Sequence, residues 1–357
     1  MRSWLMLAAL AVTPLLGQEA QSGFDLSATV TGQAAYSNLL TRYPRNGSGA
    51  MAGFRSVLYP TWKLNSHWIV SGAVEAYSRP YFSEDYTDQG YGVRVGILQA
   101  NIGYLQVWKN ASLVVRAGQL TSAFGSFLLH YDDADNALTD APMEYGYYGT
   151  GVTTFGLAGA EADLTVGKWD ARAQFTNSSP ASVRSIFDND QYGDWTGGGG
   201  YTIRQGLRVG ISAYRGPYLY AGQQFYRPGL PYRDLPASAW GADVEWARGH
   251  WNVQGEWQRF DLAYNQMPTL REEAGYVEAR RVLSPRWYVA GRAGYLHTDY
   301  GFGGETYETV AGFRPNTHQV IKAGYELCRD ASGRSGLAGS VTLQVVTTVH
   351  PLSLAYR

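Results

Sequence analysis

The side chains in this sequence whose number and spacing could carry chemistry are carboxylates and guanidinium groups. One set stands in the stretch from Thr121 to Gly149 and consists of Asp132, Asp133, Asp135, Asp140 and Glu144. A second set recurs at polar positions of alternating segments around it, namely Arg94, Arg116, Arg172 and Arg208. Acids and bases on opposite sides of a water-filled space would create a transverse field that acts on ions and dipolar solutes. The alternative is that these charges pair along a wall and keep it rigid.

No arrangement for catalysis stands beside these charges. The six histidines are scattered outside any His-Glu-x-x-His motif, and neither a Gly-x-Ser-x-Gly elbow nor a Walker loop is present. His130 in the long stretch could still face a pore, and Cys328 is expected to be a small packing residue. We therefore expect no enzyme, no catalytic residue, no resident metal and no cofactor.

Two further motifs could be either functional or purely structural. The triplet Asp188, Asn189 and Asp190 could hold Ca²⁺, but it equally suits a solvated loop tip. The run Gly197–Gly200 favours close packing or a bend within a strand, because a phosphate cradle needs a following helix and none is expected.

Composition excludes several classes of protein. The chain of 357 residues has 14% aromatic residues, which a disordered chain would lack, and its single cysteine cannot form an internal disulfide. Its net charge of −1 gives no sign of nucleic-acid binding. Charged residues are only 17%, whereas 43 Gly, 27 Tyr and 11 Trp are in excess and need an explanation.

The N-terminus has the layout of a secretory signal peptide. Arg2 precedes an almost wholly apolar run from Leu5 to Leu16, and Gly17 completes a small-residue cleavage site. We expect residues 1–17 to be removed and residues 18–357 to form one exported domain. No later run approaches the roughly 20 apolar residues of a spanning helix.

The rest of the chain alternates between apolar and polar residues. The segments 169–176, 207–214, 251–258 and 341–348 each place apolar or small residues on one face and mostly polar residues on the other. Many such segments run for ten or more residues, whereas strands of soluble proteins are usually nearer five or six. Strands of roughly 9–11 residues with an apolar outer and a polar inner face are typical of a transmembrane barrel.

The connections also alternate in length. Seven short turns fall at 64–65, 109–110, 167–168, 205–206, 249–250, 284–285 and 315–316, and eight longer links separate them. Fifteen connections predict about sixteen antiparallel strands, closed into a barrel because lipid offers no partner to a free sheet edge. Tryptophans are expected to mark the short-turn rim (62, 68, 108, 169, 251 and 287) and tyrosines the opposite rim (36, 43, 77, 81, 214, 218, 264, 295 and 300). Residues 351–357 are expected to form a tail.

Alternation also predicts which charges face the interior. The bases are Arg94, Arg116, Arg172, Arg208, Arg292, Lys322 and Arg280, and the acids are Glu75, Glu161, Asp163, Asp170, Asp243, Glu245, Glu256 and Glu326. The longest link, about residues 121–149, follows the fifth predicted strand, and a loop of that length is usually functional.

The stretch from Arg116 to Gly125, with Pro142 and a new strand from Gly151, resembles the strand end and Phe-Gly turn of bacterial outer-membrane porins of the general or phosphate-selective type. That resemblance implies a trimeric, passive outer-membrane channel for small hydrophilic solutes or ions. It also implies that residues 121–149, after the fifth strand, fold inward as a constriction loop. The balance of inward acids and bases argues against a dedicated anion channel. The expected partners are outer-membrane lipid, lipopolysaccharide and solutes. The alternatives are an adhesion, structural or partner-binding barrel, a barrel hydrolase, and a soluble secreted β-protein.

Overall fold

The computed structural model describes residues 22–38, 49–78, 81, 92–129, 132–145, 152–178, 180, 193–218, 236–264, 268–301, 303–330 and 337–356. The predicted signal peptide, His130 and the triplet 188–190 lie outside these residues.

The described residues form sixteen strands and two short 3₁₀ helices. The strands are β1 (Ser22–Ser37), β2 (Ala50–Lys63), β3 (Trp68–Ser78), β4 (Val93–Trp108), β5 (Ala111–Leu120), β6 (Leu157–Val166), β7 (Trp169–Thr176), β8 (Asp194–Arg204), β9 (Leu207–Pro217), β10 (Pro236–Arg248), β11 (Trp251–Leu262), β12 (Leu270–Val282), β13 (Trp287–Thr298), β14 (Gly303–Asn316), β15 (Gln319–Asp330) and β16 (Leu337–Tyr356). The helices are η3 (Phe127–Leu129) and η4 (Met143–Tyr145). No helix in this described part of the chain is long and apolar enough to cross a membrane.

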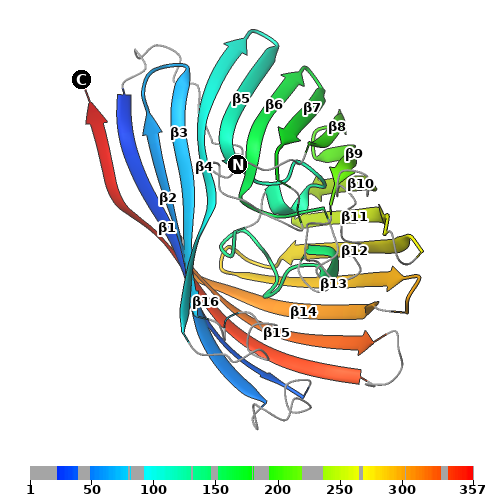
Figure 1. Ribbon diagram of the computed structural model, residues 1–357. Coiled ribbons are helices and arrows are strands. Elements are labelled where there is room, and N and C mark those ends of the chain that lie inside the picture. The colour runs from blue at the N-terminus through cyan, green and yellow to red at the C-terminus, as the bar shows by residue number, and fades with distance from the viewer. Residues whose placement is uncertain are drawn as a thin grey trace.

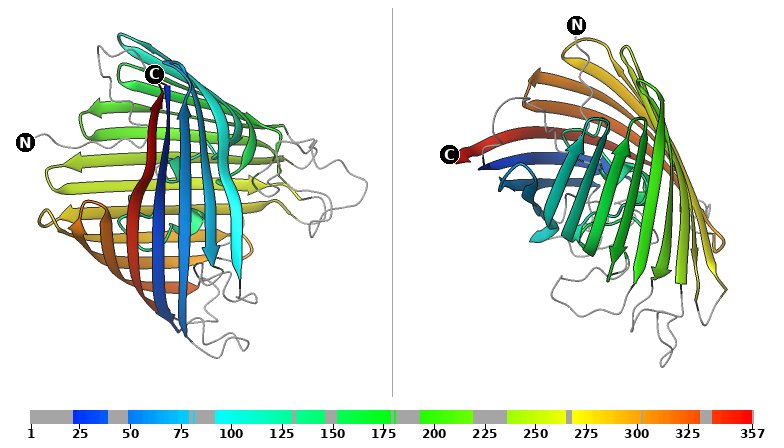
Figure 2. Two further views of the ribbon diagram at one scale, coloured as in Figure 1. Left: turned by 90° about the vertical axis from the view of Figure 1, so that its left-hand side faces the viewer. Right: turned by 90° about the horizontal axis from the view of Figure 1, so that it is seen from above.

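Each strand pairs with its sequence neighbours, and β16 pairs with β1 to close the barrel. All of these pairings are antiparallel, and Figures 1 and 2 show the strands running around the enclosed space. The predicted antiparallel barrel of about sixteen strands is thereby confirmed. Six of the seven short turns fall where they were predicted, joining β2–β3, β4–β5, β6–β7, β8–β9, β10–β11 and β12–β13. The seventh joins β14 and β15 at 317–318, two residues after the predicted 315–316.

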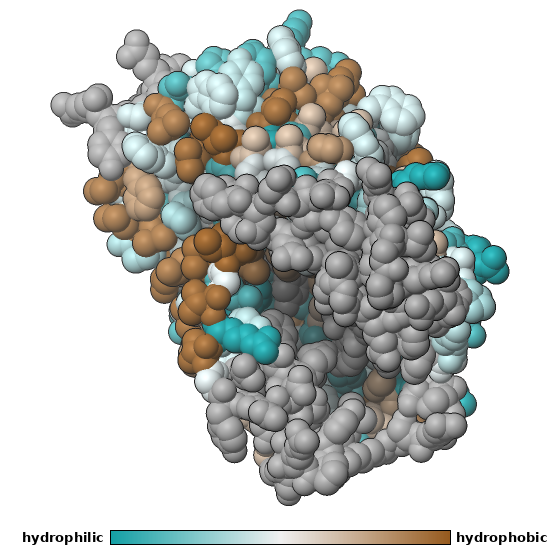
Figure 3. Space-filling model, in the orientation of Figure 1, coloured by the Kyte–Doolittle hydropathy of each residue, from teal (hydrophilic) through white to brown (hydrophobic). Residues whose placement is uncertain are grey.

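The alternation in sequence becomes an apolar outer face. Val93, Val95 and Ile97 of β4 are exposed, with Val95 73% exposed, although they are large and apolar. Ile211 of β9 is 71% exposed, whereas its neighbour Ser212 is buried. Figure 3 shows apolar side chains gathered along the left side of the view, where Figure 1 places β1 to β4. Such a surface suits lipid contact, because apolar side chains exposed to water are unfavourable.

The two aromatic predictions have different outcomes. The tryptophans beside the short turns are exposed on the outer face, from 41% for Trp68 to 63% for Trp169. Among the tyrosines predicted at the long-loop rim, Tyr43 lies outside the described residues. Tyr36 and Tyr300 are exposed, whereas Tyr81, Tyr214 and Tyr218 are buried and add nothing to an exposed girdle. Their place near a loop does not decide their face. Tyr214, for example, shares the inner face of β9 with Ser212, two residues before it.

The predicted C-terminal tail is also wrong, because β16 continues to Tyr356 and pairs with β1 as far as Ser22. Proline normally ends a paired strand because it lacks an N–H group. Here Pro351 falls where the β1–β16 register shifts, between the pairs Ala28–Val349 and Leu26–Leu352, and there an irregular pairing accommodates it.

The largest buried apolar clusters lie where residues 121–145 meet the strands. Phe124 packs in a cluster with Tyr214 and Phe260, and Leu138 packs in another with Tyr288 and Val320. We call residues 121–145 the β5–β6 segment. Its packing positions the polar contacts described next.

Candidate functional site

The first anchor of the β5–β6 segment is Asp133. Its carboxylate accepts hydrogen bonds from Thr31 Oγ1 of β1 at 2.7 Å and from the Tyr81 hydroxyl at 2.9 Å, and it forms an ion pair with Arg55 of β2 at 3.1 Å. Lys322 of β15 donates to the Asp133 carbonyl at 2.6 Å. Burial alone would raise the pKa of Asp133, but the positive charges of Arg55 and Lys322 and these hydrogen bonds outweigh it and lower that pKa.

The second anchor is Glu256 of β11, on the other side of the barrel. Its Oε1 accepts hydrogen bonds from the backbone N–H groups of Ser126 at 2.8 Å and Phe127 at 2.6 Å. The Ser126 hydroxyl also donates to Oε1, and the Tyr145 hydroxyl donates to Oε2. A carboxylate that accepts four donors from one segment holds that segment firmly.

The third anchor is Glu308 of β14, which joins the segment to Arg292 of β13. The backbone N–H and the hydroxyl of Thr139 donate to Glu308 Oε1 at 2.8 and 2.6 Å. Arg292 donates from Nη2 to Glu308 Oε2 at 2.8 Å and to the Asp140 carbonyl at 3.0 Å. The Tyr288 hydroxyl donates to the Ala137 carbonyl at 3.1 Å.

Glu144 differs from these anchors because neither of its carboxylate oxygens has a hydrogen-bond partner in the described part of the chain. It lies in η4, which contacts β12 and β13, and its neighbour Met143 packs with Ala274 and Leu296. Burial raises the pKa of Glu144 to about 8, and the nearby carboxylates Glu256 and Glu272 contribute to the increase.

The polar contacts of the segment with the described strands fall mainly on one half of the barrel. They involve β1, β2 and the run from β11 to β16, while Ser212 of β9, Gln174 of β7 and Gln99 of β4 hold only its start. Strands β2 and β11 are the two edges of this half of the closed strand order, so the segment spans the half from edge to edge. In Figure 1 the green segment with η4 runs beside β12 and β13.

The remaining wall, from β5 to β10, carries a chain of ion pairs of its own. Arg116 Nη1 binds Glu161 at 2.7 Å and also binds Asp163, which in turn lies 3.5 Å from Arg172. Arg208 binds Asp170 and Asp243, each at 2.6 Å. The three arginine side chains are 20–23% exposed, compared with 3–5% for Arg55 and Arg292 at the anchors. This wall is therefore the charged surface that water can reach.

Comparisons with known proteins bear on the whole arrangement. No family model matches the sequence, and no curated protein matches it. Solved structures do match: the anion-selective porin from Comamonas acidovorans has a TM-score of 0.63 at 10% identity, covering 92% of this chain and 100% of that chain. The OmpF structure from Salmonella typhi, a complex with daunomycin, has a TM-score of 0.62 at 11% identity, covering 91% and 97%. OmpT, an outer membrane protein from Vibrio cholerae in its trimer form, has a TM-score of 0.61 at 10% identity, covering 92% and 100%.

This chain has a porin-type barrel fold. At identities near 10% the similarity concerns the fold alone, so the chemistry of this porin-type barrel must come from its own residues.

Glycines on β8 and β9 leave room for the charged side chains on the wall of the porin-type barrel. Gly200 of β8 lies under the Arg208 guanidinium, and a Cβ added there would be 2.5 Å from Arg208 Cζ. A Cβ added at Gly210 of β9 would likewise meet the Asp243 carboxylate. The glycines let Arg208 lie flat across β8 and reach Asp170 on β7, which agrees with the close-packing interpretation of Gly197–Gly200.

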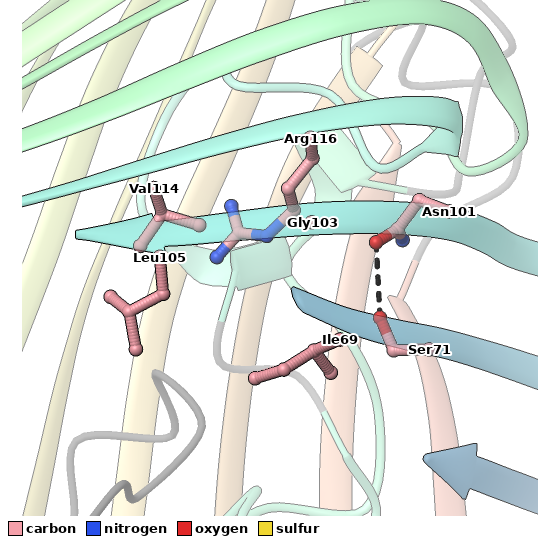
Figure 4. A pocket seen from close by; sticks show the side chains of 7 residues that line it. All are labelled: Ile69, Ser71, Asn101, Gly103, Leu105, Val114 and Arg116. Atoms are coloured by element: carbon pink, nitrogen blue, oxygen red, sulfur yellow. Dashed lines mark hydrogen bonds between the residues drawn. The ribbon is translucent and has the colours of Figure 1, made fainter. Parts of the chain in front are cut away.

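Next to this wall a small depression lies on the inner face of β3, β4 and β5, as Figure 4 shows. Arg116 reaches across Gly103 at one side, and Ser71 donates to Asn101 at 3.0 Å at the other. Ile69, Leu105 and Val114 complete its lining. The depression adds an apolar strip beside Arg116 and holds no cluster of ionisable groups.

The structure does not bring the predicted arginines and loop acids together. Within the described residues, Arg116, Arg172 and Arg208 form ion pairs only with acids on strands, and Arg94 on β4 is exposed. Asp132 accepts a hydrogen bond from the Tyr59 hydroxyl, and Asp135 is exposed. The described residues contain no group of three or more His, Cys, Asp or Glu side chains that could hold a metal ion.

Sequence reasoning missed Arg55, Thr31 and Glu308 as contacts of the segment. Arg55 shares a face of β2 with Val57, which is 1% exposed, and the two-residue spacing of this pair was the available signal in the sequence.

Proposed function

We propose that this protein is a passive diffusion channel of the bacterial outer membrane for small hydrophilic solutes or ions. The observation that carries the proposal is the water-accessible row of ion pairs on β5–β10, inside a closed barrel whose outer face is apolar. A buried row would serve rigidity alone, whereas an accessible row also presents charge to a passing solute.

In this proposal the β5–β6 segment is the constriction. Its anchors on β1, β2 and β11 to β16 occupy one side of the interior and leave the β5–β10 wall as the side along which solutes pass. Arg116, Arg172 and Arg208 line that passage and Arg94 stands near its long-loop end. Asp132, Asp133 and Asp140 anchor the segment and Glu144 is buried in it, so none of the four forms one side of a transverse field, whereas exposed Asp135 faces water.

The passage is expected to be weakly selective. Three arginines on its wall stand against four carboxylates, those of Glu161, Asp163, Asp170 and Asp243. Each arginine is hydrogen-bonded or ion-paired, so the local fields largely cancel. A small preference for cations follows from the one carboxylate in excess.

Planar-bilayer recording of the detergent-purified protein tests this proposal. We expect stepwise conductance and, across a tenfold KCl gradient, a reversal potential well below the roughly 59 mV of an ideally selective channel. An absence of steps under conditions where a known porin conducts would refute the proposal and favour an adhesion or structural barrel.

The export and assembly predictions belong to the same proposal. We propose cleavage of residues 1–17, insertion in the outer membrane in contact with lipid and lipopolysaccharide, a homotrimer, and no enzymatic activity. N-terminal sequencing of the membrane-extracted protein and light scattering in detergent test the first and third of these.

A further inference from the structure

The rim formed by the seven short turns carries unneutralised positive charge. Six of the seven turns have at least one basic residue in them or beside them. These residues, which we call the basic rim, are Lys63, Lys109, Lys168, Arg204, Arg248, Arg281 and Arg286. Arg314, near the seventh turn, instead lies over the ring of buried Tyr288. The turn residues themselves include no carboxylate.

The basic rim differs from every other group of charges in the described residues because its members form no ion pairs. The arginines of the interior wall each contact one or two carboxylates. At the long-loop end Arg259 contacts Asp261 and Glu273, and Arg271 also contacts Asp261. Lys168 instead donates to the Ile203 carbonyl at 3.2 Å. A ring of like charges without counter-charges is unfavourable unless an anion from outside supplies them.

Exposed tryptophans stand on the same rim. Trp62, Trp68, Trp108, Trp169, Trp251 and Trp287 lie at strand ends next to the turns, each at least 41% exposed. Arg281 lies over the Trp251 ring with Cζ 5.2 Å from its centroid. Tryptophan rings favour the boundary between lipid tails and headgroups, and basic side chains one step beyond them stand at headgroup depth.

From this juxtaposition we propose that the basic rim binds the anionic phospholipid headgroups of the leaflet that surrounds the short turns. The tryptophans fix the depth of the barrel in that leaflet, and the lysines and arginines supply the counter-charge to phosphate. A periplasmic polymer would account for the cations but leave the ring of exposed tryptophans unexplained. The inference rests on the proposed function only in that both need a membrane-inserted barrel.

The experiment compares lipid association of the folded protein in bilayers. The protein is reconstituted in phosphatidylcholine with a spin-labelled phosphatidylglycerol or a spin-labelled phosphatidylcholine, and the motionally restricted fraction of each label is measured. Because an anionic surface attracts each basic side chain by about fivefold in affinity, we expect a several-fold preference for phosphatidylglycerol that declines with salt.

Two matched variants give the decisive comparison. Changing Lys109, Lys168, Arg248 and Arg286 together to glutamine should abolish most of the preference. Changing four cations of the long-loop end, Arg215, Arg259, Arg271 and Arg329, to glutamine should leave it in place. Equal preference in both variants, or binding of isolated peptidoglycan sacculi without any lipid preference, would overturn the inference.

Conductance of the same bilayers separates the two proposals. A rim that prefers phosphatidylglycerol in a barrel that never conducts would refute the channel and keep the lipid site. A barrel that conducts without a preference for phosphatidylglycerol would refute the lipid site and keep the channel.

Discussion

Glu144 should make the stability of the protein depend on pH. Its carboxyl group is buried in η4 without a hydrogen-bond partner among the described residues, near Glu256 of β11, Glu272 of β12 and Arg292 of β13. Burial raises its pKa from 4.5 to about 8, so the folded protein holds a proton there that the unfolded chain releases. The contribution of Glu144 to the free energy of unfolding is therefore fully present below pH 4.5 and declines as the pH rises to about 8.

The size of this effect follows from the shift. At about 1.4 kcal/mol per pH unit, a rise in pKa from 4.5 to about 8 corresponds to a loss of about 5 kcal/mol when the segment stays docked. If undocking of the β5–β6 segment costs less free energy than this, the loss of stability is limited to the free energy of undocking. In that case η4 separates from β12 and β13 while the barrel remains closed.

The assay is guanidinium unfolding in detergent micelles from pH 4.5 to 9, followed by tryptophan fluorescence. Wild type should lose stability across this range, and Glu144→Gln, which cannot ionise, should lose much less. Asp135→Asn, a change of an exposed carboxylate in the same segment, should retain the wild-type profile. Identical profiles for wild type and Glu144→Gln would refute the reasoning.

Three further predictions concern the anchors and the wall. Asp133→Asn removes a buried carboxylate charge that faces Arg55 and Lys322, and we expect the free energy of unfolding in the same assay to fall by about 3 kcal/mol; an unchanged value would mean that the anchor is not formed. Gly200→Val places a side chain against Arg208 and should lower single-channel conductance without a large change in reversal potential, whereas Gly197→Ala, whose Cβ has no contact closer than 3.3 Å, should conduct like wild type. Arg208→Gln removes one of three lining cations and should move the reversal potential toward cation selectivity; a shift toward anions would contradict the proposed lining.

The strand pattern was predictable because lipid contact imposes the same requirement on every strand. Alternation places Ile211 outward and Ser212 inward whatever lies on the neighbouring strand, and the short turns need only two to four residues. The barrel and its seven turns therefore follow from local information. Pro351 was misread because its accommodation depends on a register shift against β1, more than 300 residues earlier.

The pairing of charges was not predictable, because alternation gives the face of a residue but not its partner. Asp133 meets Arg55, which is 78 residues earlier, and Thr139 meets Glu308, which is 169 residues later. These separations in sequence depend on which strands the β5–β6 segment contacts. On the wall, by contrast, Asp163 faces Arg172 directly across the β6–β7 pair, and such neighbours could be inferred once the turn at Gly167 was identified.

The pairing of β1 with β16 has a consequence for biosynthesis. The first and last segments of the chain form one seam, in which Ser22 meets Tyr356 and Tyr36 meets Val341. Until β16 has been made, β1 has no second neighbour, and its N–H and C=O groups cannot all be satisfied in lipid. A chain that lacks β16 would leave two unpaired edges at once, on β1 and β15, so the strands before it cannot reside stably in a membrane until β16 joins them.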